Sequence, residues 1–377
     1  MMLLRLLETM DPVRFESKVA TLGPPGSMAP MFREIGIDPI AISRQARRLS
    51  PLGFFRLLSV IRDFKPHIIQ TWLYHAGTVG LLAGKIQRKP VCWSLHANQL
   101  DLAQERFPLR LAFRVMALLS PLVDAAVIVS YDSRHWHSTL AFRPPSWIHI
   151  PVGVDTAHFR PDPDAGVRLR AELGLTKESK LVGTVGRFHS HKDLGTFLRA
   201  IAKLAELRDD VHCVMIGPDI TSSNSQLIQM VENLEIGSRM HMLGQRSDVA
   251  SLVAGLDVMC LSSRVESCPT VLIEAMACGV PCVTTNAGDA GLIVGDAGAT
   301  VPIGDAISMS RRCAELLDLD KNRRDRLQAR CRARVEKYFS LSDAARSHED
   351  LYQQLALGGR GSTLESIGRS ARLQALT

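Results

Sequence analysis

The sequence lacks a long apolar run. It has no stretch of about 18 uninterrupted apolar residues, the length that a membrane-crossing helix requires. Its most apolar region, 109–129, is interrupted by Arg110, Arg114 and Asp124. The first residues, MMLLRLLETMDP, have an apolar core too short for a signal peptide and include Glu8. We therefore expect a cytoplasmic protein without a transmembrane helix.

Paired cysteines and the common nucleotide-binding glycine motifs are also missing. None of the eight cysteines forms a CxxC pair, and most lie in apolar stretches, such as Cys213, Cys260 and Cys282. We expect such cysteines to be reduced, buried thiols. The absence of G-x-G-x-x-G and of G-x4-G-K-[ST] argues against a dinucleotide-dependent oxidoreductase and against a P-loop enzyme.

No cluster of side chains predicts a metal site. The D-x-D patterns at 162–164 and 318–320 lie in a Pro-rich connection and at a charged helix end, so neither follows a suitable strand. The His pairs at 135/137 and 189/191 have no third ligand nearby in the sequence. We expect no metal and no other cofactor.

The composition is that of a globular protein with a basic surface. The 377 residues are enough for two domains, and 46% of them are hydrophobic and 22% charged. The formal charge of +7 suits an anionic partner, such as a nucleotide, a nucleic acid or an acidic membrane face. The Arg-rich patches at 44–48 and 323–334 lack the interleaved aromatic residues of a single-strand site. We expect solvated helix faces there, and no nucleic-acid partner.

Apolar strands alternate with amphipathic helices along both halves of the chain, which predicts an α/β fold with doubly wound parallel sheets. Predicted strands are 16–22, 40–42, 67–72, 91–96, 125–130, 147–151, 181–187, 211–217, 240–243 and 258–261. Predicted helices include 2–10, 31–35, 51–64, 75–86, a long helical region ending near 121, 193–207, 225–233 and 248–256.

This alternation divides the chain into two domains. We predict a first domain over 1–158 and a second over 180–340. The Pro- and Asp-rich stretch between them, 159–179, is expected to be a linker. A C-terminal helix that returns to the first domain, followed by a flexible tail, is expected over 341–377.

The stretch 266–281, ESCPTVLIEAMACGVP, is predicted to form a loop followed by a short helix. Pro269 favours the first helical turn because its ring presets φ and its missing N–H is not needed there. Gly279 and Pro281 favour termination, so the helix is predicted over 270–278. The free N–H groups at the start of such a helix can bind an anion.

Two carboxylates accompany this helix start. Glu266 precedes the helix, and Glu274 lies one turn after Thr270 on the same face. This arrangement suits a ligand that carries both phosphates and hydroxyls. On spacing alone, two solvated carboxylates on an ordinary strand–loop–helix unit are the simpler interpretation.

A second polar cluster follows the predicted strand 181–187. Gly186 allows a ligand to approach the backbone, and Arg187 and Lys192 are cations suited to a diphosphate. Ligands of open α/β sheets bind beyond the carboxyl ends of the strands, where these residues are expected. Solvated surface charges are the alternative for such a pair.

The segment 266–281 resembles the E-x7-E signature of the retaining GT-B glycosyltransferases, in particular glycosyltransferase family 4. It departs from that pattern at Cys268 and Thr270. The segment 185–192 resembles the V-G-R-x(4)-K element of the same family. The resemblance, which covers about 2–352, implies the GT-B fold, with two Rossmann-like, doubly wound domains facing a cleft.

The resemblance implies a nucleotide-sugar donor bound by the second domain. Arg187 and Lys192 would neutralise the leaving diphosphate, Glu266 would hold hydroxyls of the donor sugar, and Glu274 those of the ribose. The loop 243–246 (LGQR) would line the nucleobase. The implied donor-binding residues are Gly186, Arg187, Lys192, Gly244, Gln245, Arg246, Glu266, Ser267, Cys268, Thr270, Val271 and Glu274.

The first domain contributes one implied catalytic residue, His96, which follows a predicted strand in SLHANQLD. A lone His there is more often structural, but the resemblance implies a contact with the transferred sugar. His96 therefore joins Glu266, Arg187 and Lys192 as an expected catalytic residue.

The segment TWLYHA (71–76) resembles bacterial exopolysaccharide and lipopolysaccharide members of the family. It implies Trp72, Tyr74 and His75 as acceptor contacts, with core packing as the alternative for Trp72. Family members begin with a strand and a Gly-rich loop before a helix like 2–10. We therefore expect the first strand of the first domain to be missing.

The expected activity is transfer of a sugar, UDP-linked in the simplest case, with retention of anomeric configuration. No carboxylate is an obvious nucleophile, so a front-face mechanism is expected. The acceptor would be a lipid-linked or polysaccharide intermediate, with peripheral contact at the inner membrane face through the helix 51–64. The alternatives are a non-catalytic GT-B protein that binds nucleotide-sugar and, without support in the motifs, a nucleotide-sugar epimerase.

Overall fold

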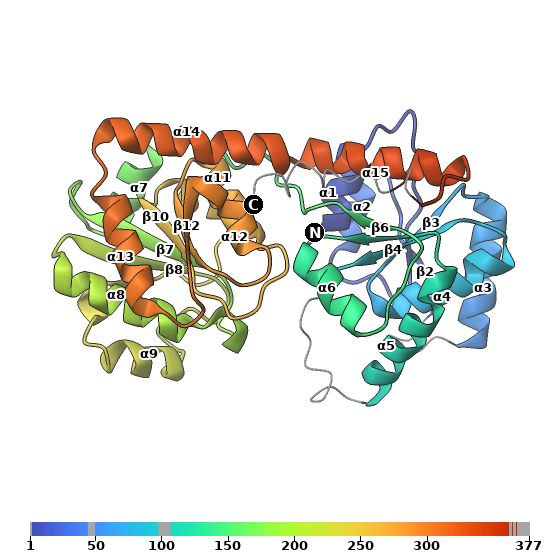
Figure 1. Ribbon diagram of the computed structural model, residues 1–377, viewed down its shortest axis with the longest axis horizontal. Helices are drawn as coiled ribbons and strands as arrows, with labels where there is room; N and C mark the ends of the chain where they lie inside the picture. Colours follow the sequence, from blue (N-terminus) through green and yellow to red (C-terminus); the bar gives the residue numbers. More distant parts are fainter. Residues whose placement is uncertain (1, 44–49, 97–106, 362–363, 365–366, 368–377) are drawn as a thin grey trace. The chain divides into compact units, whose positions relative to one another are not determined.

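The computed structural model describes residues 2–43, 50–96, 107–361, 364 and 367 (Figure 1). The chain forms two compact units. The first unit contains the chain up to Gly153 together with the part that starts at Leu341, and the second contains Val154–Ser340. The C-terminal helix thus belongs to the same unit as the N-terminal half.

The first unit is an α/β structure with parallel strands only. A two-stranded sheet pairs β1 with β2, and a four-stranded sheet has the order β3-β4-β5-β6. Its strands are β1 (Ala20–Thr21), β2 (Ile40–Ala41), β3 (Ile69–Trp72), β4 (Val91–Leu95), β5 (Ala125–Ile128) and β6 (Trp147–His149). Its helices are α1 (Met2–Thr9), α2 (Ala29–Glu34), α3 (Pro51–Phe64), α4 (Tyr74–Ile86), α5 (Phe107–Leu119), the 3-10 turn η1 (Ser120–Leu122), α6 (Tyr131–Thr139) and α15 (Leu341–Ala356).

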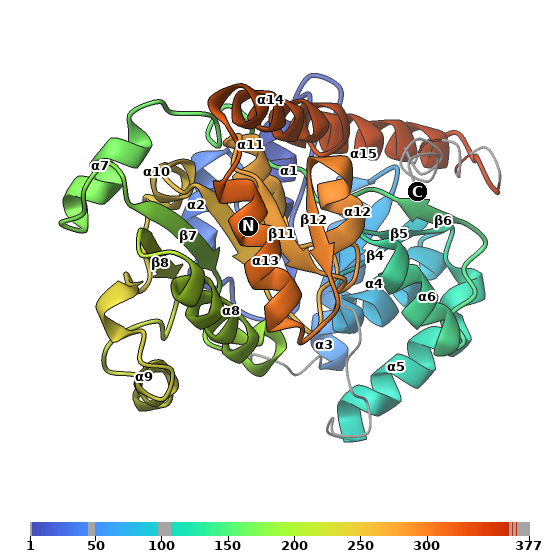
Figure 2. The same ribbon diagram turned by 60° about the vertical axis from the view of Figure 1, so that its left-hand side comes forward.

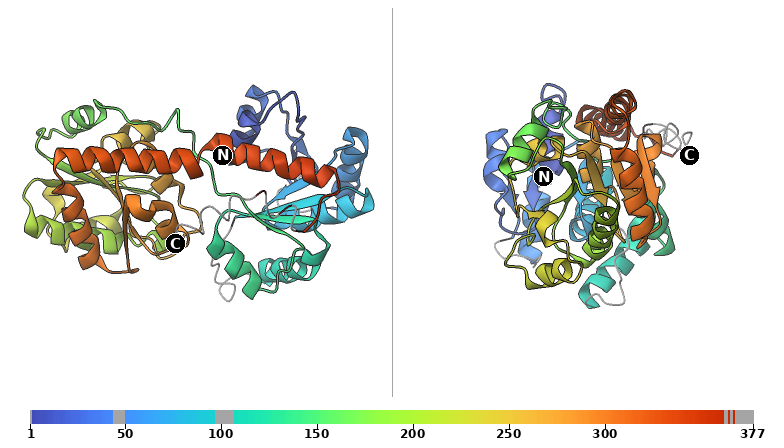
Figure 3. Two further views of the ribbon diagram at one scale, coloured as in Figure 1. Left: turned by 45° about the horizontal axis from the view of Figure 1, so that its top comes forward. Right: turned by 90° about the vertical axis from the view of Figure 1, so that its left-hand side faces the viewer.

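Helices cover both faces of the four-stranded sheet. On one face, side chains of α4 and α5 pack against the sheet, among them Leu81, Phe113 and Met116. On the other face, Leu351 and Leu355 of α15 pack against β4, β5 and β6 (Figure 3, left). The sequential strand order places successive crossover helices on one face, because such crossovers are right-handed. The opposite face is therefore left for α15.

The second unit is a doubly wound parallel sheet in the order β12-β11-β10-β7-β8-β9. Its strands are β7 (Lys180–Val185), β8 (Val211–Ile216), β9 (Met240–Met242), β10 (Val258–Leu261), β11 (Cys282–Thr285) and β12 (Gly298–Val301). Its helices are α7 (Ala165–Glu172), α8 (Leu194–Leu207), α9 (Ser225–Glu232), α10 (Val249–Ala254), α11 (Thr270–Ala277), α12 (Ala290–Val294), α13 (Ala306–Leu317) and α14 (Lys321–Tyr338), with short 3-10 turns η2 (Ser190–Lys192), η3 (Gly237–Arg239) and η4 (Gly295–Ala297).

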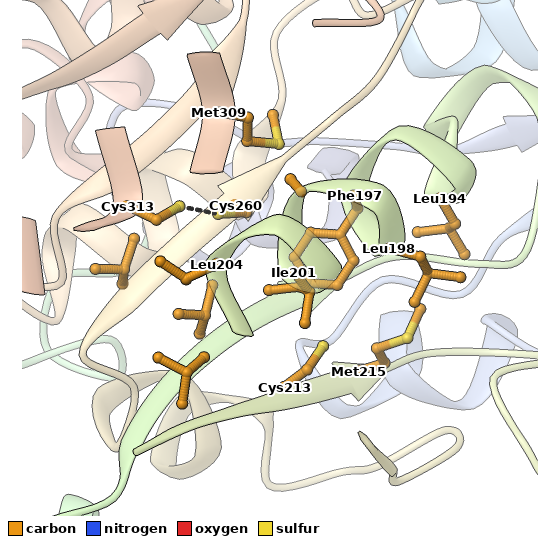
Figure 4. Packing of buried hydrophobic residues seen from close by; sticks show 14 of the residues in the cluster. Leu194, Phe197, Leu198, Ile201, Leu204, Cys213, Met215, Cys260, Met309 and Cys313 are labelled. Atoms are coloured by element: carbon orange, nitrogen blue, oxygen red, sulfur yellow. Dashed lines mark hydrogen bonds between the residues drawn. The ribbon is translucent and has the colours of Figure 1, made fainter. Parts of the chain in front are cut away.

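One face of this sheet is covered by α8 and α13, which lie side by side (Figure 2). Phe197 and Ile201 of α8 point into the core between these helices and the strands (Figure 4). The Sγ atoms of Cys260 on β10 and Cys313 on α13 are 3.3 Å apart in this core. All eight cysteines are free thiols, and all but Cys268 are buried. The α8–α13 core thus holds the strands that carry the polar residues described below.

The expected linker 159–179 is not an irregular connection. It contains α7, whose Leu169 and Arg170 are buried and which packs against α10 in the second unit. The prediction missed this helix because Asp and Pro dominate its N-terminal flank. At the two points where the chain changes units, Val154 and Ser340 form a parallel bridge.

Most other predicted elements are present, with ends that differ by one to three residues. The exception is the predicted strand 16–22, of which only β1 pairs. Its partner β2 is equally short, so the ladder cannot extend. The predicted helical region before 121 is described only from Phe107, and its earlier part lies outside the described residues.

Candidate active site

The functional side chains of the second unit lie at the carboxyl ends of its central strands. β7 pairs with β10 on one side and with β8 on the other, so the chain reverses its direction of winding at β7. In open α/β sheets, ligands bind at this switch point. The segments that follow β7 and β10 carry the residues singled out from the sequence.

Lys192 and Glu266 form the centre of this site. Lys192 Nζ lies 2.6 Å from Glu266 Oε1, and Ser263 Oγ donates to the same oxygen at 2.6 Å. The two side chains are only 23% and 12% exposed, so this ion pair is largely shielded from water. The two residues are far apart in sequence and are brought together because β7 and β10 are neighbours.

The loops that carry the pair are fastened to each other by polar contacts. Ser262 Oγ donates to the carbonyls of Lys192 at 2.9 Å and Asp193 at 3.0 Å. Arg264 Nε lies 2.8 Å from Asp193 Oδ2, and Asp193 also caps α8 at Thr196. Burial opposes the effect, but these hydrogen bonds lower the pKa of Asp193. The position of Lys192 is therefore fixed before any ligand binds.

Two glycines allow backbones to approach closely at this edge. Gly288 has φ +55, and a Cβ there would lie 2.2 Å from the Glu266 carbonyl oxygen. Gly217 has φ +147, and a Cβ there would lie 2.0 Å from the Gly186 carbonyl oxygen. A side chain at either position would displace the loops that carry Glu266 or Arg187.

The helix α11 begins at Thr270, as predicted, after a short loop that follows Glu266. Its N-cap residue, Pro269, makes no side-chain cap, and Thr270 and Val271 form the first turn. An uncapped helix start offers backbone N–H groups and a partial positive charge to an anion. Glu274 lies one turn later and is partly exposed. Ser267 and Cys268 lie in the loop before the helix and are also partly exposed.

Arg187 is exposed and forms no ion pair with any residue that the structure describes. Gly186 precedes it after the end of β7, where the atoms nearest to an added Cβ belong to the Lys192 side chain, at 3.5–3.7 Å. Desolvation and then the positive charges of Arg187, His191 and Lys192 lower the pKa of His189. This segment therefore presents positive charge beside the start of α11.

The expected nucleobase loop follows β9. Gly244 has φ +63, and its carbonyl accepts a hydrogen bond from Gly217 N at 2.8 Å. Gln245 is exposed. The Arg246 guanidinium is engaged by Asp248 at 2.7 Å and by Glu172 of α7 at 2.6 Å, and these contacts raise its pKa. Arg246 is thus paired with carboxylates.

In the first unit, Trp72 ends β3 and His96 follows β4. Their rings are stacked, with centroids 4.9 Å apart and an interplanar angle of 11°. Burial, and secondarily the charge of His348, lower the pKa of His96 to about 4. His96 is thus a neutral imidazole at pH 7.

The expected acceptor contact Tyr74 has little exposed surface. Its side chain is buried in the core against Phe113, with ring centroids 4.1 Å apart, and its hydroxyl lies 2.8 Å from His137 Nε2. Its neighbour His75 is exposed. Trp72 is partly buried and packs beside α1 and α15. Of the three predicted acceptor residues, His75 is the most accessible.

Among the described residues, no group of three or more His, Cys, Asp or Glu side chains could hold a metal ion. In the same part of the chain, no helix is long and apolar enough to cross a membrane.

Family models match both halves of the chain. The model "Glycosyltransferase Family 4" matches residues 2–158, and "Glycosyl transferases group 1" matches residues 168–334. The fold is similar to that of the Anabaena protein HepE in complex with UDP, with a TM-score of 0.79 and 20% identity over 94% of this chain and 95% of that one. This chain belongs to the GT-B glycosyltransferases, a class of transferases.

Curated relatives include enzymes for several acceptors. The chain is 31% identical over 188 residues to the N-acetyl-alpha-D-glucosaminyl L-malate synthase of Bacillus anthracis, covering 49% of this chain and 48% of that enzyme. It is 23% identical to the UDP-Gal:alpha-D-GlcNAc-diphosphoundecaprenol alpha-1,3-galactosyltransferase of Escherichia coli, over 78% of this chain and 77% of that one. The chain thus spans about half the length of the first relative and about three quarters of the second.

Sequence reasoning missed the supporting residues Asp193, Arg264 and Gly288, and it named none of the side chains of α15 that pack in the first unit. The Gly288 signal was present, since a turn-rich NAGD segment follows β11. The partners of Asp193 and the side chains of α15 depend on strand order and chain return, which spacing does not encode.

Proposed function

We propose that this chain transfers a sugar from a nucleoside diphosphate sugar, UDP-linked in the first instance, to a lipid-linked or saccharide acceptor in cell-surface polysaccharide synthesis. The observation that carries this proposal is the Lys192–Glu266 pair at 2.6 Å beside the uncapped start of α11. Cation, carboxylate and helix start together suit a ligand with a diphosphate next to sugar hydroxyls.

Each group has a distinct part in the proposed reaction. The bond between the anomeric carbon and the phosphate oxygen breaks, a bond to the acceptor oxygen forms, and the acceptor proton passes to the leaving phosphate. Arg187, Lys192 and the first N–H groups of α11 stabilise the charge that develops on the diphosphate. Glu266, already bound to Lys192 and Ser263, holds donor hydroxyls rather than attacking carbon. In the front-face mechanism that we propose from the resemblance, the acceptor attacks from the face that the leaving group occupies, which gives retention.

The names of the relatives leave the donor open. The Escherichia coli relative is named for UDP-Gal, and a Corynebacterium glutamicum relative, 26% identical over 77% of this chain, is named as GDP-mannose-dependent. The test is a panel of UDP- and GDP-sugars, in which the release of nucleotide is measured with water as acceptor. We expect release from one or two donors. Binding of nucleotide without release from any of them would favour the non-catalytic alternative.

Glu274→Ala tests the ribose contact. We expect it to weaken nucleotide binding about tenfold, the effect of losing a hydrogen bond to a charged group. The matched control is Glu315→Ala, on an exposed surface of α13 in the same unit. Unchanged affinity in the Glu274→Ala variant would refute the ribose assignment.

Peripheral membrane contact is proposed for α3. Leu52 and Phe55 are exposed on this helix next to Arg56 and Arg62, an arrangement that suits an anionic lipid surface. The protein should sediment together with vesicles of anionic phospholipid, and Phe55→Glu should leave it in the supernatant. Leu207→Glu, at an exposed apolar residue of the second unit, is the control. Equal loss in both variants would argue against a role for α3.

A further inference from the structure

Polar contacts fix the position of α15 over the sheet of the first unit. The Tyr352 hydroxyl donates to Gln70 Oε1, and Gln70 Nε2 donates to Ser94 Oγ at 2.5 Å. One turn of α15 is therefore anchored over residue 70 of β3 and residue 94 of β4. None of these residues belongs to the site of the second unit.

One helical turn before Tyr352, α15 carries His348 next to the ends of β3 and β4. Two residues further along the chain, Trp72 ends β3 and His96 follows the end of β4. At the rise of an extended chain, each lies about 6.6 Å beyond residue 70 or residue 94. Four residues back along α15 stands His348, about 6 Å away. Trp72 packs in one cluster with Ala345 of α15. The earlier residues of α15 therefore lie on the same side of Tyr352 as Trp72 lies of Gln70. After burial, the electrostatic interaction with His348 further lowers the pKa of His96, because a proton on both neighbouring rings is unfavourable.

The tautomer of His348 follows from its hydrogen bond. Its Nδ1 lies 2.9 Å from the Ala344 carbonyl oxygen, which can only accept, so Nδ1 carries the proton and Nε2 is an acceptor. This Nε2 is buried and has no hydrogen-bond partner among the described residues, and the same holds for His96 Nε2. Buried polar atoms are normally hydrogen-bonded. One small group placed between the two Nε2 atoms would provide a hydrogen bond to both.

We propose that the Nε2 atoms of His96 and His348 bind one hydroxyl group between them, and that His348 is a positioning residue for His96. A hydroxyl donates one hydrogen bond and accepts another. It would donate to His348 Nε2 and accept from His96 Nε2–H. This arrangement selects the Nε2–H tautomer of His96, while the stacked Trp72 ring sets its plane. The hydroxyl belongs either to a water molecule or to a saccharide.

The tautomers are tested directly by ring-nitrogen NMR of the full chain labelled with 15N-histidine. We expect an Nδ1–H tautomer for His348 and an Nε2–H tautomer for His96. His348→Leu should shift the His96 ring signals, whereas Tyr352→Phe, one turn away on the same helix, should leave that tautomer unchanged. An Nδ1–H tautomer of His96, or identical His96 signals in folded His348→Leu, would overturn the proposal.

The source of the hydroxyl is tested by adding UDP-glucose to the labelled protein. Signals that stay unchanged indicate a resident water molecule, and signals of both rings that change together indicate a sugar hydroxyl. Both results require the paired tautomers described above. A change in the His96 signals alone, with His348 unaffected, would contradict a shared ligand.

The kinetic consequence rests on the proposed function. We expect His348→Leu to lower kcat for nucleotide release at least tenfold, and His348→Gln, which keeps an acceptor near the Nε2 position, to recover most of it. Nucleotide affinity should stay unchanged in both, because its binding residues lie in the second unit. Equal kcat in the Leu and Gln variants would refute the positioning role. Absence of release in the wild type would refute the proposed function instead, and the NMR result would still decide the pairing.

Discussion

The Lys192–Glu266 pair offers the sharpest test of how the proposed donor site is built. At 2.6 Å, two unit charges attract by about 6 kcal/mol at an effective dielectric constant of about 20. Desolvation offsets much of this attraction, so removal of one partner should cost about 2–3 kcal/mol, chiefly by leaving the other charge shielded from water. Lys192→Met and Glu266→Gln remove one charge each with little change in volume.

The assay must report on the second unit alone. All four tryptophans lie in the first unit, so their fluorescence follows only that part of the chain. Amide hydrogen exchange in β7 and β10 reports the stability of the second unit. We expect both single variants to be destabilised there, and the double variant to be destabilised by less than the sum, with a coupling of about 1–2 kcal/mol. Tryptophan fluorescence should show an unchanged first unit.

The variants should change activity and stability by different amounts. Lys192→Met removes a cation from the proposed diphosphate site, so nucleotide release should fall by about 100-fold or more. The double variant should remain inactive, although its loss of stability is smaller than the sum of the two single losses. Lys203→Ala, which removes an exposed ion pair with Glu206 on α8, is the control and should cost less than about 1 kcal/mol. Additive effects on stability, or a Lys192→Met enzyme with normal release, would refute this account.

Three further predictions follow from single contacts. Gly288→Ala should destabilise the second unit by about 1–3 kcal/mol and lower nucleotide release, because φ is +55 and the new Cβ meets Glu266; normal release would refute the close approach. Arg170→Met should cost about 3 kcal/mol in hydrogen exchange, because it leaves Asp257 unpaired; an effect below about 1 kcal/mol would mean that the pair is solvated. Burial lowers the pKa of His137 from 6.5 to about 4, so between these pH values the unfolded chain binds a proton that the folded chain does not. Roughly 3 kcal/mol of the free energy of unfolding is therefore lost as pH falls through that range. Urea unfolding followed by tryptophan fluorescence at pH 7 and pH 5 should show part of this loss, and His137→Gln should reduce it.

The donor helix could be predicted because its signals are local. Pro269 and Gly279 mark the start and end of α11, and the helix ends within one residue of the prediction. The contact between Lys192 and Glu266 could not be predicted from the residues, because 73 residues separate them in sequence. It depends on β7 and β10 being neighbours, which is a property of strand order.

Two further findings have physical causes of a different kind. α7 was read as a linker because its flank is rich in Pro and Asp, and its helix is held by the tertiary contact between Arg170 and Asp257. Tyr74 is an expected acceptor contact only through the resemblance of TWLYHA to family members, which says nothing of its packing. Its burial depends on Phe113 and His137, which come from helices much later in the chain.

The two cations of the proposed donor site differ in a way that the sequence could not show. Arg187 has no ion pair among the described residues, so a diphosphate can engage it without breaking an existing contact. Lys192 is already bound to Glu266, so a diphosphate must share it with that carboxylate. A ligand whose sugar hydroxyls bond to Glu266 while its phosphates approach Lys192 satisfies both partners at once. Inorganic diphosphate satisfies only the cation and leaves Glu266 facing a second anion. If the proposed function holds, we therefore expect this pair to bind an intact nucleotide-sugar more tightly than inorganic diphosphate, as competition binding of the two ligands would show.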